Sequence, residues 1–197
     1  MITISIYKIS YSQCTNIVNI EANADYATTG NYYKDIYNVL NQFEGHYIYT
    51  NGTTSFEIVL EKMVMSTLYN NRYCEDMLIG AYKYVKNGVV IYDKLNDLNN
   101  NYTDGVKYLI NGNLILTGQY RGCDDCANNE KRVVLSIGEP EAGQFYDLHI
   151  RKIQHNGQQA IKIFLYLDSL TRVNAVGSPP LPELKLPFGE DLILLKQ

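Results

Sequence analysis

The pair Cys123 and Cys126, in the stretch GCDDC, is where the residue types and their spacing first suggest chemistry. Two thiols separated by two residues can bind a metal ion, exchange electrons or form a local disulfide. The same loop carries oxygen ligands of the kind that calcium prefers. These are Asp124, Asp125, Asn128, Asn129 and Glu130. Four hypotheses therefore apply to this segment.

The metal and redox hypotheses each lack a required feature. A structural zinc site takes four ligands, commonly from a second cysteine pair or a histidine pair. The other candidate ligands are singly placed, at Cys14, Cys74, His46, His149 and His155. A redox cysteine needs a lowered thiol pKa, and the acids between the two thiols oppose it. The candidate calcium ligands do not follow the spacing of an EF-hand. No metal site and no cofactor are expected.

A disulfide is the hypothesis that the cysteine count favours. Four cysteines are an even number, which in an oxidising compartment favours two bonds. A bond between Cys123 and Cys126 leaves Cys14 and Cys74 as the second pair, which ties the N-terminal region to the rest of the fold. This is the favoured connectivity of the three that are possible. In a reducing compartment all four cysteines are expected to be plain thiols.

Catalytic apparatus is not visible elsewhere in the sequence. Asp147, His149 and Arg151 alternate along one predicted strand and share a face, but a solvated sheet face is the preferred explanation of this row, because antiparallel sheets commonly keep one wet side. The sequence contains no G-x-S-x-G, HExxH, P-loop or G-x-G-x-x-G motif. The protein is therefore expected not to be an enzyme.

The composition indicates one folded, β-rich domain. The chain has 197 residues, 46% of them hydrophobic, with 18 Tyr and no Trp. The formal net charge is −4 and the basic residues are scattered, so nucleic acid is not an expected partner. No apolar run approaches the ~20 residues of a membrane-spanning helix.

The sequence divides into three predicted parts. Residues 1–12 are the remnant of an export signal or an extra strand, because Ser10 and Ser12 suit a cleavage site while Ile2, Ile4 and Ile6 alternate with other residues. Residues 13–30 are a polar lead-in. Residues 31–197 are predicted to form one helix and a β-barrel.

The helix is predicted at residues 31–44, where apolar side chains recur at steps of three and four. These are Tyr33, Ile36, Tyr37, Leu40 and Phe43, and Gly45 suits the helix C-cap.

After Gly45 the hydrophobic period becomes two, and Asn-Gly turns separate the apolar runs. Both residues tolerate positive φ, which a type I′ hairpin requires. The turns are Asn51-Gly52, Asn87-Gly88, Asn111-Gly112 and Asn156-Gly157. The predicted strands are residues 46–50, 54–65, 72–86, 89–93, 106–110, 113–120, 132–137, 144–154, 159–167 and 192–196. The predicted fold is all-β, an antiparallel up-and-down meander of eight to ten strands closing into a barrel. The proline-bearing loop at residues 168–191 is expected to run extended over the surface.

The segment FEGHY, which ends at Tyr47, resembles the entry to lipocalin-like barrels. In those barrels Gly-x-Trp opens the first strand, and here Tyr47 stands at the Trp position. The resemblance implies a lipocalin-like architecture.

Four longer segments resemble successive blocks of a family of exported bacterial proteins known as a domain of unknown function. They are FEGHYIYTNGTTSFEIVLEK, RYCEDMLIGAYKYVKNG, CDDCANNEKRVVLSI and NGQQAIKIFL. The resemblance implies a compact β domain and an exported location, which is periplasmic, outer-membrane-associated or secreted. It brings no established activity.

Tyrosines in the predicted strands are the candidate ligand-binding residues, because their rings are both apolar and polar. The candidates are Tyr47, Tyr82, Tyr84 and Tyr108. The first functional hypothesis is a non-catalytic exported protein that holds a small, partly apolar ligand inside the barrel. The alternative is a structural or accessory cell-envelope protein that contacts a protein partner and binds no ligand. A filled barrel interior favours the alternative.

Overall fold

The computed structural model describes residues 14–22, 28–68, 72–119, 123–167 and 177–197, which form eleven strands and three short 3-10 helices. The strands are β1 (Asn16–Asn19), β2 (Asn31–Lys34), β3 (Gly45–Asn51), β4 (Thr54–Leu68), β5 (Tyr73–Lys86), β6 (Val89–Asp93), β7 (Ile110–Thr117), β8 (Lys131–Glu139), β9 (Gln144–His155), β10 (Gln158–Tyr166) and β11 (Asp191–Lys196). The 3-10 helices are η1 (Leu40–Phe43), η2 (Leu95–Asn99) and η3 (Gly105–Lys107). Nine of the ten predicted strands are present, with ends shifted by no more than three residues. The predicted export-signal remnant at residues 1–12 lies outside the described residues.

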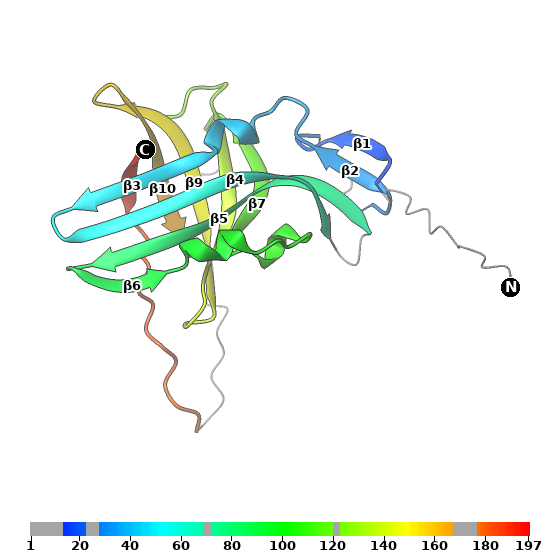
Figure 1. Cartoon of the computed structure of the whole chain (residues 1–197). Helices are drawn as coiled ribbons and strands as arrows, with labels where there is room; N and C mark the ends of the chain where they lie inside the picture. The colour runs from blue at the N-terminus through cyan, green and yellow to red at the C-terminus, as the bar shows by residue number, and fades with distance from the viewer. Residues whose placement is uncertain (1–13, 23–27, 69–71, 120–122, 168–176) are drawn as a thin grey trace, which may run out of the picture.

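Eight strands close into an antiparallel barrel, which forms the main body of the molecule in Figure 1. Strands β3, β4 and β5 pair in chain order, and so do β7 to β11. The ring is completed where β5 pairs with β7 and β11 pairs with β3. Strand β6 pairs with the end of β5. The predicted all-β class and the closed antiparallel up-and-down meander are therefore confirmed.

The Asn-Gly turns have three different outcomes. Asn87-Gly88 and Asn156-Gly157 have positive φ at both residues and join β5 to β6 and β9 to β10, as predicted. Asn51-Gly52 also lies at a hairpin, but Asn51 pairs with Thr54, so the two-residue loop begins one residue later.

Asn111-Gly112 does not form a hairpin, and the predicted strand at 106–110 is wrong. Residues Gly105–Lys107 form η3, and β7 runs from Ile110 through Gly112 with a bulge before Leu114. Gly112 has a φ of +142°, and a Cβ there would lie 3.1 Å from the Leu135 Cα on β8. The glycine therefore permits a close strand approach instead of a turn.

The predicted helix at residues 31–44 is wrong. Residues Asn31–Lys34 form β2, which lies parallel to β5, and only Leu40–Phe43 are helical. The Asp35 carboxylate accepts hydrogen bonds from two backbone N–H groups just before and at the start of η1, at 2.8 and 2.9 Å. The apolar residues do not share one face, because Tyr37 is 69% exposed. The pairing of β2 with β5 and the local hydrogen bonds of Asp35 therefore replace the predicted helix.

The barrel interior is filled by side chains that alternate along the strands. On β4, Phe56, Ile58 and Leu60 are buried while the residues between them are more accessible. Inward residues of other strands, such as Leu148 and Ile163, have no accessible surface. A void wide enough for water beside these side chains would leave part of their surface accessible. Among the described residues, the inward-facing core is therefore packed.

Strands β1 and β2 attach the N-terminal region to the barrel. They pair in parallel with each other, and β2 pairs in parallel with β5. A disulfide joins Cys14 to Cys74 at the start of β5, and Glu21 forms an ion pair with Lys131 of β8. In the described ranges, no helix has the length and apolar composition needed to cross a bilayer.

A buried ionic network stabilises this attachment. The Lys62 Nζ lies 2.9 Å from the Asp35 carboxylate and 3.9 Å from that of Asp76. Asp76 also accepts a hydrogen bond from the Tyr32 hydroxyl at 2.5 Å, and bonds from the N–H groups of Asp35 and Met65 at 3.1 Å each. The network therefore ties β2 and η1 to β4 and β5.

The segment before β11 packs beside the hairpin that joins β8 and β9. Its described part, residues 177–190, contains no strand, and Leu186 is buried in the core. The wholly buried Glu139 accepts hydrogen bonds from the hydroxyls of Tyr92 and Tyr146 at 2.8 and 2.6 Å, and from a backbone N–H of this segment at 2.7 Å. The loop predicted to run over the surface therefore contributes to the core.

Buried tyrosines predict a loss of stability at high pH. Burial is the first cause of a raised pKa at Tyr32, Tyr47, Tyr82, Tyr84 and Tyr92. For Tyr47, burial and the nearby Glu44 carboxylate raise the pKa to about 12 from 10.0. A raised folded-state pKa favours the protonated phenol, so this stabilisation is complete below pH 10 and is lost as the pH rises through the folded-state pKa. We expect the free energy of unfolding to fall progressively as the pH rises above 10, because the unfolded chain then loses phenolic protons that these tyrosines retain in the folded state.

The measurement is a pH titration that follows tyrosinate absorbance and far-UV circular dichroism together. These tyrosines are expected to ionise only as the sheet signal is lost. Reversible ionisation of every tyrosine with the sheet signal intact would contradict the expectation.

Candidate functional site

Two clefts lie on the outer face of the barrel. The larger has a volume of about 820 Å³, within the roughly 300–1,000 Å³ of small-molecule sites. It is lined by strands β8 to β11 and by the loop that carries Cys123 and Cys126. The smaller, of about 440 Å³, lies over β3 and β11. The larger cleft, named the outer cleft below, is the better candidate because charged and aromatic side chains converge on it.

Three cations from neighbouring strands form one row of the outer cleft. The sheet register places Arg151 of β9 between Arg132 of β8 and Lys162 of β10. Like charges directly opposite each other destabilise a sheet. Arg132 is buried and its guanidinium donates to the Gly118 carbonyl at 2.9 Å, while burial lowers its pKa. The row therefore requires nearby carboxylates.

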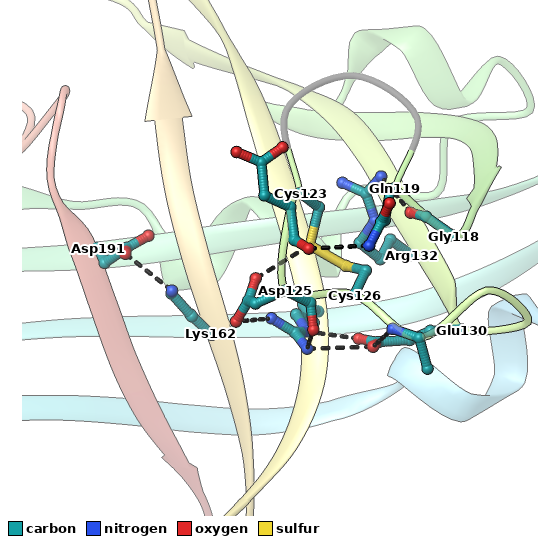
Figure 2. The surroundings of a disulfide bond; sticks show 12 residues. Gly118, Gln119, Cys123, Asp125, Cys126, Glu130, Arg132, Lys162 and Asp191 are labelled. Atoms are coloured by element: carbon teal, nitrogen blue, oxygen red, sulfur yellow. Dashed lines mark hydrogen bonds and ion pairs between the residues drawn. A yellow bond between two sulfur atoms is a disulfide. The ribbon is translucent and has the colours of Figure 1, made fainter.

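The disulfide loop supplies two of these carboxylates to Arg151. Cys123 and Cys126 are bonded, and both are buried at the edge of the cleft. Figure 2 shows Asp125 and Glu130 on either side of this bond, with their carboxylates turned toward β9. The Arg151 guanidinium lies 2.5 Å from Glu130 and 2.8 Å from Asp125.

These contacts shift the pKa of both partners. Hydrogen bonds from Arg151 hold the pKa of the Asp125 carboxyl below its usual value. Hydrogen bonds to Glu130 and then Asp125 raise the pKa of Arg151. Arg151 is therefore charged and already neutralised by its own chain.

Lys162 has its own counterion and is the cation nearest to β11. Its Nζ lies 2.8 Å from the Asp191 carboxylate, a contact that Figure 2 shows across β10 and β11. This pair is partly exposed, so it contributes at most about 1 kcal/mol to stability.

The aromatic side chains of Phe164 and Tyr166 and the Asp147 carboxylate form the other half of the cleft. Phe164 lies opposite His149, and Tyr166 lies opposite Asp147. The His149 and Tyr166 rings meet edge to face with centroids 6.5 Å apart. The structure therefore places the predicted row of residues 147, 149 and 151 in a cleft, beside two rings from β10.

The bonded cysteines limit the metal chemistry of this loop. Ligand atoms of Cys123, Asp125 and Cys126 lie within 4.8 Å of one another. A cysteine binds a metal as its thiolate, and two sulfurs that are bonded to each other are not thiolates. In this disulfide form the loop acts as a support for Asp125. The two disulfides are the pairs that the cysteine count favoured.

The four predicted ligand-binding tyrosines do not line the outer cleft. Tyr47, Tyr82 and Tyr84 belong to the packed barrel core. Tyr108 lies in a separate buried cluster with residues of β5 and η2. These four side chains are therefore at most 6% exposed.

Sequence reasoning missed Lys162, Phe164, Tyr166 and Asp191. A signal for three of them was present, because a two-residue turn at Asn156-Gly157 sets the register of the strands on either side. That register places residues 162, 164 and 166 opposite residues 151, 149 and 147.

The whole chain, residues 1–197, matches the model of DUF6705, a family of unknown function. The chain belongs to this family. The predicted resemblance to a domain of unknown function is confirmed to that extent. No curated protein matches the chain, and no solved structure matches it. The family description carries no activity, so the function of this DUF6705 member must be argued from its own cleft.

Proposed function

We propose that this protein is an exported, non-catalytic binding protein that holds a small, partly apolar ligand in the outer cleft. The observation that supports the proposal most is the contrast between a packed interior and a cleft of about 820 Å³ on the outer face. The cleft combines aromatic rings with a few charged groups, which is typical of small-molecule sites.

Because the core is packed, the proposed ligand site lies on the surface of the barrel and not inside it. An eight-stranded barrel is just wide enough to be filled by side chains or to hold one small ligand. Here Tyr82 and Ile161 are wholly buried among other core residues. A ligand at the predicted tyrosines would have to displace this core.

Two disulfides support export. Disulfides persist in oxidising compartments and are rare in the cytosol. Cys14–Cys74 and Cys123–Cys126 account for all four cysteines. A periplasmic, outer-membrane-associated or secreted protein of bacterial origin agrees with the resemblance found in the sequence.

The second candidate function is an accessory envelope protein that contacts a protein partner and binds no small ligand. The filled interior favours this candidate too. Exposed tyrosines would suit such a contact, but Tyr37, Tyr102 and Tyr166 come from three separate segments. The outer cleft therefore supports the first candidate better.

The test compares two exposed aromatic residues of the same region. Tyr166 lines the cleft and is 48% exposed, whereas Phe145 is 56% exposed and does not line it. In amide NMR spectra, phenethyl alcohol is expected to shift the signals of β9 and β10 around the cleft. Tyr166→Ala is expected to weaken this binding roughly three- to tenfold, because an aromatic contact contributes about 0.5–1.5 kcal/mol.

Phe145→Ala is the matched control and should leave the affinity unchanged. Shifts spread over core residues of the barrel would instead favour a ligand inside it. A spectrum with no localised shifts would count against a small-molecule site and for the second candidate.

A further inference from the structure

We infer that the outer cleft selects a ligand with a cationic amine, which binds between the Asp147 carboxylate and the Tyr166 ring. The inference rests on the proposed function, because it names the chemical class that the cleft would take. Its basis is the Asp147 carboxylate, which lines the cleft and has no ion pair within the described residues.

Two of the three cations of the cleft are paired with carboxylates of the chain itself, and the third, Arg132, is buried and donates to the Gly118 carbonyl. Arg151 contacts Asp125 and Glu130, and Lys162 contacts Asp191. An anionic ligand would have to displace one of these carboxylates, so its gain at the cation is offset by the loss of an existing ion pair. The disulfide makes such a displacement harder at Asp125, because Cys123 and Cys126 flank it and restrain the loop.

Asp147 differs from the other carboxylates of the cleft. Its side chain is half-buried and makes no hydrogen bond or ion pair with any residue in the described part of the chain. The outward neighbours of this carboxylate are Ser136 of β8, Tyr166 of β10, and Phe145 and His149 on its own strand. A bound cation would therefore meet a carboxylate for which no cation of the described chain competes.

The aromatic neighbour adds to the same preference. The Tyr166 ring is 48% exposed and lies directly opposite Asp147 across β9 and β10. A cation over an aromatic face gains roughly 0.5–1 kcal/mol at an exposed site. Phe164, in the next row of the cleft, offers apolar contact to the rest of the ligand. A carboxylate, an aromatic face and an apolar wall together fit a primary amine attached to an apolar group.

The test uses three probes of similar size that differ in charge: phenethylamine, phenethyl alcohol and hydrocinnamate. Each is titrated at neutral pH into the full chain, and amide NMR shifts of β9 and β10 give the affinity. Phenethylamine is expected to bind at least tenfold more tightly than hydrocinnamate, with the largest shifts around Asp147 and Tyr166. Asp147→Asn keeps the side-chain shape and is expected to weaken amine binding about tenfold without changing the affinity for the alcohol.

Two further variants separate this charge effect from others. Asp93→Asn removes a partly exposed carboxylate on β6, outside the cleft, and should change none of the three affinities. Asp191→Asn releases Lys162 from its counterion and is expected to improve binding of hydrocinnamate.

The outcomes distinguish this inference from the proposed function. Equal affinity for amine and carboxylate, or amine binding that survives Asp147→Asn, overturns the inference while alcohol binding in the cleft upholds the proposed function. Failure of all three probes to shift the cleft signals overturns both.

Discussion

Asp76→Asn is expected to lower the free energy of unfolding by about 3–5 kcal/mol, the effect of removing one partner from a buried ion pair. Both carboxylate oxygens of Asp76 accept hydrogen bonds: one from Tyr32 and Met65, the other from the Asp35 backbone N–H. An asparagine has only one such oxygen. Whichever way its amide is turned, an N–H group faces another donor, and Lys62 loses a nearby charge.

Urea unfolding of the variant and the parent protein measures this difference. Asp93→Asn is the matched control, because it removes a carboxylate from a partly exposed pair with Lys83 on the barrel surface. That control should cost much less than Asp76→Asn, because a solvent-exposed ion pair contributes little to stability. Similar losses for the two variants would mean that the buried network has no special contribution to stability.

Replacement of Cys14 and Cys74 by serine is expected to cost about 4 kcal/mol. The two residues are 60 apart in the sequence, and closing a loop of that length removes much entropy from the unfolded chain. Cys123 and Cys126 are only three apart, so the same change there is expected to cost about 2 kcal/mol. The Cys14–Cys74 disulfide, which closes the longer loop, therefore contributes more to stability, while the Cys123–Cys126 disulfide supports the cleft.

Unfolding of the two double variants in urea gives the comparison directly. Because Cys14 precedes β1 and Cys74 lies in β5, loss of the Cys14–Cys74 disulfide should also increase amide exchange in β1 and β2. Equal destabilisation by the two double variants, or unchanged exchange in β1 and β2, would contradict the assigned roles.

Local patterns in the sequence were sufficient for most of the barrel. Alternating apolar residues on β4 and β9 bury every second side chain, and positive φ at Asn87 and Asn156 is what a type I′ turn requires. These features depend on neighbours a few residues away, which the sequence displays.

The errors occur where distant contacts decide the conformation. The segment at residues 31–44 has helical spacing, yet its first residues pair with β5 and Asp35 contacts Lys62. Gly112 resembles a turn residue, yet its lack of a side chain is used for close contact with β8. Neither contact partner can be read from the adjacent residues.

Some of the residues that line the outer cleft could be predicted from the sequence. Asp147, His149 and Arg151 share a face by parity alone, and the turn at 156–157 sets their partners on β10. The neutralisation of Arg151 was not predictable, because it depends on how the disulfide loop folds back onto β9. From the sequence alone a solvated face was therefore the preferred explanation of a row that lines a cleft in the structure.

The sequence by itself determined an all-β meander, its hairpins and an even set of cysteines, because alternation, turn chemistry and residue counts are local properties. Only the tertiary structure decided that the barrel is packed and that the cleft lies outside it. Interior volume depends on the side chains of all eight strands together, and a cleft depends on which loop covers which strand. Both are sums over contacts between residues far apart in the chain, which no single segment of the sequence contains.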